Sequence, residues 1–124
     1  MKNILVIGLG LIGGSIAKSL NKKEFNVFGM DTNSQTIKKA TSDKAISQKC
    51  NHIEEFLAHN NDGIIVFATS PSTVIKIIES NRKILNTNFS ITDVSSSKLN
   101  ISKFLDKYEP KNFVFSHPVA GSHK

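Results

Sequence analysis

A strand that runs into a helix through a glycine-rich turn is the feature that most constrains this chain. Four apolar residues of high β-propensity, at positions 4–7, precede Gly8, Gly10 and Gly13, and an amphipathic stretch follows. Gly8 permits a tight turn, Gly10 lets a ligand approach the backbone, and Gly13 lets helix and strand pack closely. The free N–H groups at the start of such a helix favour an anion. The spacing therefore predicts a site for the pyrophosphate of a dinucleotide.

The end of the next apolar run completes this predicted site. Asp31 follows Gly8 at close to the roughly 20-residue spacing expected for the acid that binds the adenosine ribose. A carboxylate there repels a 2′-phosphate, and no arginine lies nearby in the sequence, so we expect NAD rather than NADP. The alternative is an ordinary glycine turn beside a chance acid. The residues expected to contact NAD are Gly8, Leu9, Gly10, Leu11, Ile12, Gly13, Asp31, Thr69 and Ser70.

Short apolar runs alternate with longer amphipathic stretches along the whole chain. We expect strands at residues 3–7, 26–30, 45–47, 63–68, 89–94 and 112–116. We expect helices at residues 12–22, 34–41, 53–60, 71–85 and 99–108, with Ile12, Ile16 and Leu20 turned toward the sheet. This alternation predicts parallel strands joined by right-handed crossovers. The fold class is therefore α/β, a Rossmann-type doubly wound parallel sheet of about six strands in the order 3-2-1-4-5-6.

Length and composition restrict the class of protein. A chain of 124 residues can form one domain with a hydrophobic core. Its net charge of +6 comes from scattered lysines and one arginine, Arg82, without a basic run interleaved with aromatic residues, so we expect no nucleic-acid partner. No apolar run approaches the ~18 residues of a membrane span, and the first strand begins too early for a cleavable signal peptide. The single cysteine, Cys50, suits a reducing compartment, so we expect a cytoplasmic location.

Two polar segments follow the last two predicted strands. Residues 92–98 read TDVSSSK and residues 116–124 read SHPVAGSHK. In a doubly wound sheet these strand ends face the nicotinamide half of a dinucleotide. A neutral imidazole at His117 would accept the proton of a substrate hydroxyl while hydride leaves the adjacent carbon, and a neighbouring serine would orient the ring. The alternative is a structural His-Pro turn. Cys50 and His52 lack further ligands at metal-binding spacing, so we predict no metal site.

Three segments together resemble the prephenate and arogenate dehydrogenases of tyrosine biosynthesis. They are VIGLGLIGGS at residues 6–15, TDVSSSK at 92–98 and HPVAGSHK at 117–124, and the resemblance spans the whole chain. It implies an NAD-dependent oxidative decarboxylation of prephenate to 4-hydroxyphenylpyruvate, or the equivalent reaction of arogenate. It also implies that His117 binds the ring hydroxyl of the substrate, that Ser96 holds both the histidine and the substrate, and that Ser122 contacts the substrate. His117 and Ser96 are the implied catalytic residues.

The family resemblance also implies a larger protein. Members continue into a second, mainly helical domain that dimerises and supplies basic residues for the substrate carboxylates. We therefore expect residues 1–124 to form a single dinucleotide-binding domain, truncated relative to the family. Such a domain would bind NAD, stay monomeric and turn over no substrate by itself. Two alternatives stay open: a non-catalytic NAD-binding module, and a dehydrogenase of the same superfamily that acts on another hydroxy acid.

Overall fold

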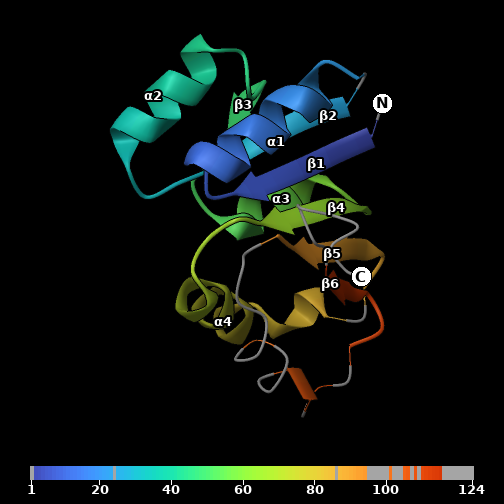
Figure 1. Cartoon of the computed structure of the whole chain (residues 1–124). Helices are drawn as coiled ribbons and strands as arrows, with labels where there is room; N and C mark the ends of the chain where they lie inside the picture. Colours follow the sequence, from blue (N-terminus) through green and yellow to red (C-terminus); the bar gives the residue numbers. More distant parts are fainter. Residues whose placement is uncertain are drawn as a thin grey trace, which may run out of the picture.

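Strands and helices alternate along the chain in the computed structural model, which describes residues 2–23, 25–85, 87–94, 101, 105–106, 108 and 110–115 (Figure 1). The strands are β1 (Lys2–Ile7), β2 (Phe25–Met30), β3 (Gln48–Lys49), β4 (Gly63–Phe67), β5 (Phe89–Asp93) and β6 (Phe113–Phe115). The helices are α1 (Leu11–Asn21), α2 (Ser34–Ser42), α3 (Ile53–His59) and α4 (Pro71–Ser80), and a short 3₁₀ helix (Arg82–Ile84) follows α4. No helix in the described part of the chain is long and apolar enough to cross a membrane.

Within the described residues the strands form one parallel sheet in the order β3-β2-β1-β4-β5-β6. The predicted strand order and the α/β fold class are therefore confirmed. β1 lies at the centre and pairs with β2 from Lys2↔Phe25 to Ile7↔Met30. Its other neighbour is β4. After β3 the chain therefore returns past β1 and adds β4, β5 and β6 at the opposite edge of β1. The carboxyl ends of β1 and β4 meet at this switch, which is where ligands bind in sheets of this kind.

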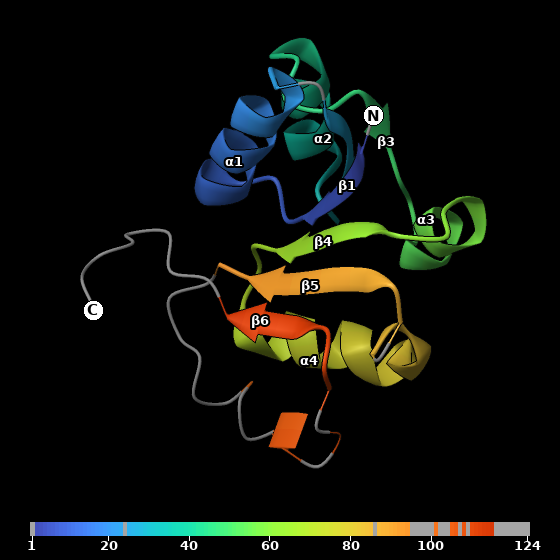
Figure 2. The same ribbon diagram turned by 90° about the vertical axis from the view of Figure 1, so that its right-hand side faces the viewer.

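Helices cover both faces of the sheet. Ile4 and Val6 of β1 belong to one buried cluster, which packs with α1 and α2, whereas Leu5 and Ile7 belong to a second cluster, which packs with α3 and α4. Successive side chains of a strand point to opposite faces, so a strand covered on both sides must be apolar throughout. Figure 2 shows α1 and α3 on opposite sides of β1 and β4. The continuous apolar runs in the sequence follow from this arrangement.

The inward face of α1 differs from the prediction. Ile12 is 51% exposed, whereas Gly13 and Ala17 are buried, with Ile16 and Leu20 packed at the edge of the cluster. A Cβ atom at Gly13 would lie 1.8 Å from the carbonyl oxygen of Gly8. The small residues therefore let α1 lie directly against the turn that precedes it. Ile12 therefore lies outside the packed face, whereas Ile16 and Leu20 pack against the cluster as predicted.

The third strand begins later than predicted. Residues 45–47 were expected to form it, but β3 is Gln48–Lys49, which pairs with Phe28 and Gly29 of β2. Ala45 and Ile46 are nevertheless buried, with 3% and 4% of their surface exposed. A Cβ atom at Gly29 would lie 2.6 Å from Cγ2 of Ile46, so this isoleucine covers the glycine. Ala45 and Ile46 enter the core from a loop, so the prediction of a strand at residues 45–47 was wrong.

The helix predicted at residues 71–85 is divided into two. α4 ends at Ser80, and Asn81, with φ −138° and ψ 50°, separates it from the 3₁₀ helix. The helix predicted at residues 99–108 lies mostly outside the described residues, although Ile101 and Leu105 are buried in the cluster with α3 and α4. β6 lies within the predicted strand at residues 112–116.

Candidate functional site

The turn from β1 into α1 is held between the ends of two neighbouring strands. The N–H of Gly8 donates to the carbonyl oxygen of Met30, and the N–H of Ala68 donates to that of Ile7, both at 2.8 Å. Gly8 has a φ of +96°, and a Cβ atom there would lie 2.5 Å from the carbonyl oxygen of Ala68. Both the backbone conformation and the approach of the β4 end therefore require glycine at this position.

The amino end of α1 receives no side-chain cap from its own N-cap residue. Its N-cap residue, Gly10, provides no side-chain hydrogen bond, and the first turn contains no acidic residue. A Cβ atom at Gly10 would meet no atom of the described residues within 4 Å, although its φ of −69° suits any residue. The protein itself therefore does not need glycine here. An uncapped helix start with open space above it fits an anionic group that approaches the backbone closely.

Asp31 lies beside this turn, at the end of β2. Its Oδ2 atom accepts the N–H of Leu9 at 2.8 Å, and its Oδ1 atom accepts the N–H of Asn33 at 2.9 Å. A carboxylate has about four acceptor positions, so each oxygen keeps one for a ligand. Asn33 in turn caps α2, because its side-chain oxygen accepts the N–H groups of Gln35 and Thr36. The carboxylate is thus fixed next to the glycine turn, which is where the sequence analysis predicts the adenosine ribose to bind.

The predicted residues after β4 have different surroundings. A Cβ atom at Gly8 would lie 2.7 Å from Cγ2 of Thr69, so Thr69 directly adjoins the glycine turn. The hydroxyl of Ser70 accepts the N–H of Thr73 at 3.4 Å, and the hydroxyls of Ser72 and Thr73 lie 3.2 Å and 3.0 Å from it. Pro71 occupies the first turn of α4. Ser70 is therefore already used as the cap of α4.

The strands that lead to the two predicted catalytic segments end side by side. Asp93, at the end of β5, pairs with Phe67 of β4 and with Phe115 of β6, and its side chain is fully buried. The N–H of Val94 donates to the carbonyl oxygen of Phe67 at 2.9 Å. Ser96, His117 and Ser122 lie outside the described residues. Their predicted roles stay predictions.

The surroundings of Cys50 favour a structural role. Burial raises the pKa of the Cys50 thiol, and the negative charge of Glu55 raises it further. The thiol donates to the carbonyl oxygen of His52 at 3.1 Å, and His52 is the N-cap residue of α3. In the part of the chain that the structure describes, no three His, Cys, Asp or Glu side chains are grouped to hold a metal ion.

Comparison with known proteins identifies related sequences and structures. Residues 16–124 match the family model described as "Prephenate dehydrogenase, nucleotide-binding domain". The prephenate dehydrogenase of Bacillus subtilis is 30% identical over 127 residues, which cover 98% of this chain. The crystal structure of prephenate dehydrogenase from Aquifex aeolicus is 30% identical with a TM-score of 0.81 and covers the whole chain. The same enzyme in complex with hydroxyphenyl propionate and NAD⁺ is 28% identical with a TM-score of 0.76.

These relatives are longer than the chain. It spans 33% of the Bacillus subtilis protein and 45% and 44% of the two Aquifex aeolicus chains. The match to the family model begins at residue 16, after the glycine turn, whereas the Aquifex aeolicus structures include the turn because they cover the chain fully. The comparison therefore concerns one part of each relative.

Proposed function

Since the chain belongs to the prephenate dehydrogenase family, by virtue of its nucleotide-binding domain, we propose that it binds NAD and supplies the cofactor half of a prephenate or arogenate dehydrogenase. The observation that carries the proposal is the open space that the described residues leave at Gly10, beside a helix start whose N-cap residue makes no side-chain hydrogen bond. The Aquifex aeolicus structure supports the proposal, because it matches the whole of this chain and was solved in complex with NAD⁺.

The described residues fit the two ends of the adenosine diphosphate part of NAD. The N–H groups at the start of α1 would hold the pyrophosphate, and the missing side chain at Gly10 leaves room for it. The Asp31 carboxylate would accept hydrogen bonds from the ribose hydroxyls with the acceptor positions that Leu9 and Asn33 leave free. Leu11 and Ile12 would line the path between them, and Thr69 would close it from the β4 side, while Gly13 would serve the site by letting α1 lie against the glycine turn.

The chemical step is assigned to residues after β5 and β6. NAD, when bound, supplies the acceptor for the hydride that leaves the hydroxyl-bearing ring carbon of the substrate. His117 takes the proton of that hydroxyl as the ring carboxylate departs as carbon dioxide and the ring becomes aromatic. Ser96 holds the imidazole and the substrate, and Ser122 adds a contact to the substrate. The parallel pairing of β5 and β6 supports this assignment, because the two segments that contain these residues begin at neighbouring strand ends.

The assignment covers one part of the reaction. We propose that residues 1–124 act as a single dinucleotide-binding domain, that this domain is monomeric by itself, and that turnover needs a further domain that dimerises and binds the substrate carboxylates. The chain's span of 33% of the Bacillus subtilis protein supports this division. We also propose a cytoplasmic location, where a reducing environment preserves the buried Cys50 thiol.

Titration of the purified chain with NAD tests the proposal. We expect saturable binding by calorimetry and a rise in melting temperature, because a ligand that binds only the folded state stabilises it. Addition of prephenate is expected to yield no NADH. Failure to bind NAD at millimolar concentration would refute the cofactor assignment, and NADH formation from prephenate would refute the need for a further domain.

A further inference from the structure

The last residues of five strands form one row along the carboxyl edge of the sheet. Met30 pairs with Ile7, Ile7 with Phe67, Phe67 with Asp93, and Asp93 with Phe115. Figure 2 shows β4, β5 and β6 ending at the same side of the molecule. Adjacent strands lie about 4.8 Å apart, so Asp93 is about 14 Å along this row from Met30. The row therefore gives the order in which residues follow one another along the edge where ligands bind.

The proposed cofactor site follows the same row. Asp31, the proposed ribose ligand, comes directly after Met30, and Gly8 of the proposed pyrophosphate turn comes directly after Ile7. Both positions lie on the same side of β4 in the sheet. A dinucleotide that extends along the edge from Asp31 past Gly8 therefore brings its nicotinamide half over the ends of β4 and β5. Asp93 is the last residue of β5, at this far end of the path.

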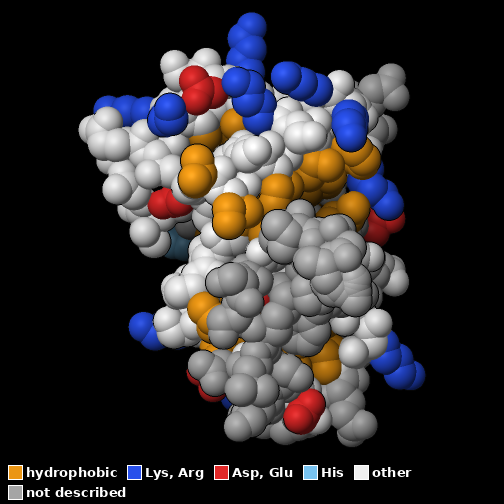
Figure 3. Space-filling view, in the orientation of Figure 1, with side chains coloured by type: hydrophobic (Ala, Val, Ile, Leu, Met, Phe, Trp, Pro, Cys, Tyr) orange, Lys and Arg blue, Asp and Glu red, His pale blue; other side chains and the backbone are white. Residues whose placement is uncertain are grey.

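Among the described residues, Asp93 is the one charged residue that is buried. Along β5 it shares a face with Phe89 and Ile91, which belong to the apolar cluster that packs with α3 and α4. On the face seen in Figure 3, by contrast, the Asp and Glu side chains lie separately at the surface. A carboxylate loses its hydration on burial at a large cost in free energy. Packing alone therefore does not explain a carboxylate at this position.

A buried negative charge acts on the charge of a nicotinamide ring. The oxidised ring of NAD⁺ carries one positive charge, and the reduced ring of NADH carries none. Charges interact more strongly inside a protein than in water, and salt screens a buried charge less than an exposed one. A carboxylate at the end of β5 therefore stabilises the oxidised cofactor relative to the reduced one.

We propose that the Asp93 carboxylate makes the cofactor site prefer NAD⁺ to NADH. The inference rests on the proposed function, because it needs the nicotinamide half over the ends of β4 and β5. Such a preference suits the proposed reaction. Loss of carbon dioxide and formation of an aromatic ring make the reaction run in one direction, so the cofactor is bound oxidised and released reduced. Asp93 promotes this exchange through its charge and takes no part in proton or hydride transfer.

The dissociation constants of the purified chain for NAD⁺ and NADH test this inference. Calorimetric titration of the wild-type chain is expected to show tighter binding of NAD⁺ than of NADH. Asp93→Asn keeps the shape of the side chain and removes its charge. In this variant we expect the dissociation constant of NADH, divided by that of NAD⁺, to fall about fivefold or more. A purely structural role would weaken both cofactors alike and leave this ratio unchanged.

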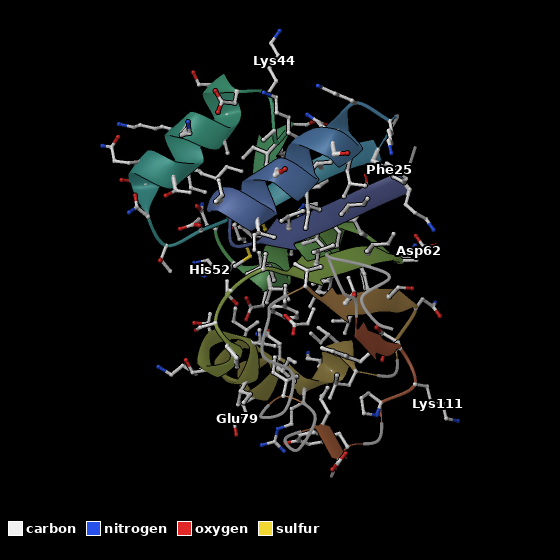
Figure 4. All side chains as sticks on the ribbon, viewed as in Figure 1. Phe25, Lys44, His52, Asp62, Glu79 and Lys111 are labelled. Carbon is white, nitrogen blue, oxygen red and sulfur yellow. The ribbon has the colours of Figure 1, made fainter. Side chains whose placement is uncertain are left out.

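Asp62→Asn is the matched control for the loss of one negative charge. Asp62 is exposed and directly precedes β4, so it lies at the edge of the sheet opposite to Asp93 (Figure 4). We expect this variant to change the ratio of the two dissociation constants by less than about twofold, because solvent and salt screen an exposed charge.

Melting temperatures establish that each variant is folded, and the wild-type ratio decides if Asp93→Asn is not. Tighter binding of NADH than of NAD⁺ by the wild-type chain overturns this inference and leaves the proposed function intact. An unchanged ratio in Asp93→Asn, or an equal change in Asp62→Asn, has the same consequence. Binding of neither cofactor overturns both the inference and the proposed function.

Discussion

The turns after β1 and β4 begin two helices in opposite ways, although the two strands are neighbours in the sheet. At α4 the protein supplies a side-chain cap: Ser70 accepts the N–H of Thr73, and Pro71 in the first turn brings no N–H of its own. At α1 it supplies a glycine N-cap without a side-chain hydrogen bond.

The difference separates a structural turn from a turn left for a ligand. A side-chain cap satisfies one of the free N–H groups at a helix start, whereas a start without such a cap leaves that group for water or for an anion. Glycine serves both purposes within the first turn. Gly13 is required by the carbonyl of Gly8, which lies 1.8 Å from where its Cβ would be, whereas Gly10 has open space instead. The comparison therefore distinguishes packing from binding at single positions.

Replacing Gly13 with alanine is expected to have the largest effect. The new Cβ would collide with the backbone of Gly8, so α1 must move away from β1. We expect the free energy of unfolding to fall by about 3 kcal/mol or more in urea denaturation. The matched control is Gly14→Ala, where the Cβ would lie 3.1 Å from the carbonyl oxygen of Leu9 and helix propensity improves. An equal loss of stability in both variants would contradict the packing role of Gly13.

Replacing Gly10 with alanine is expected to separate binding from folding. The Cβ meets open space, so the free energy of unfolding should change by less than about 1 kcal/mol, the cost of alanine in place of glycine at an N-cap. The same methyl group would occupy the proposed pyrophosphate position, and we expect the dissociation constant of NAD to rise on the order of 10²-fold. Calorimetry and urea denaturation of one preparation measure both quantities. Unchanged NAD affinity would show that the open turn serves no dinucleotide.

Replacing Ser70 with alanine is expected to have the smallest effect. Loss of the cap should lower the free energy of unfolding by about 1 kcal/mol, while the dissociation constant of NAD changes less than about threefold. Ser72→Ala is the control, since Ser72 contacts the Ser70 hydroxyl without capping the helix. If Ser70→Ala weakens NAD binding more than this, Ser70 contacts the cofactor, as the sequence predicts, and the two turns are less different than their caps indicate.

The sequence predicted most of the fold because apolar runs and polar turns are local signals. Residues 63–68 were recognisable as a strand since a parallel strand buried on both faces has no polar positions, and Pro71 marked the next helix. The errors occur where a packing contact, and not the local pattern of apolar residues, decides which side chains are buried. Ile46 is buried over Gly29, and Ile12 is exposed because Gly13 lies against Gly8. Neither contact can be inferred from periodicity.

The candidate site was predictable where one segment builds it. Gly8, Gly10, Gly13 and Asp31 occur at a spacing that has a mechanical reason, and the structure brings Asp31 to the amide of Leu9. The open space at Gly10 could not be predicted, because it depends on which side chains pack around the start of α1.

The two hydrogen bonds to Asp31 also affect how that residue must be studied. Because Leu9 and Asn33 fix the carboxylate before any ligand arrives, the entropy of ordering its side chain is lost during folding and need not be lost again on binding. The same bonds connect the β1 turn to the start of α2. Removal of the carboxylate would therefore loosen two turns as well as one ribose contact, and an affinity measured on such a variant would report the sum of all three.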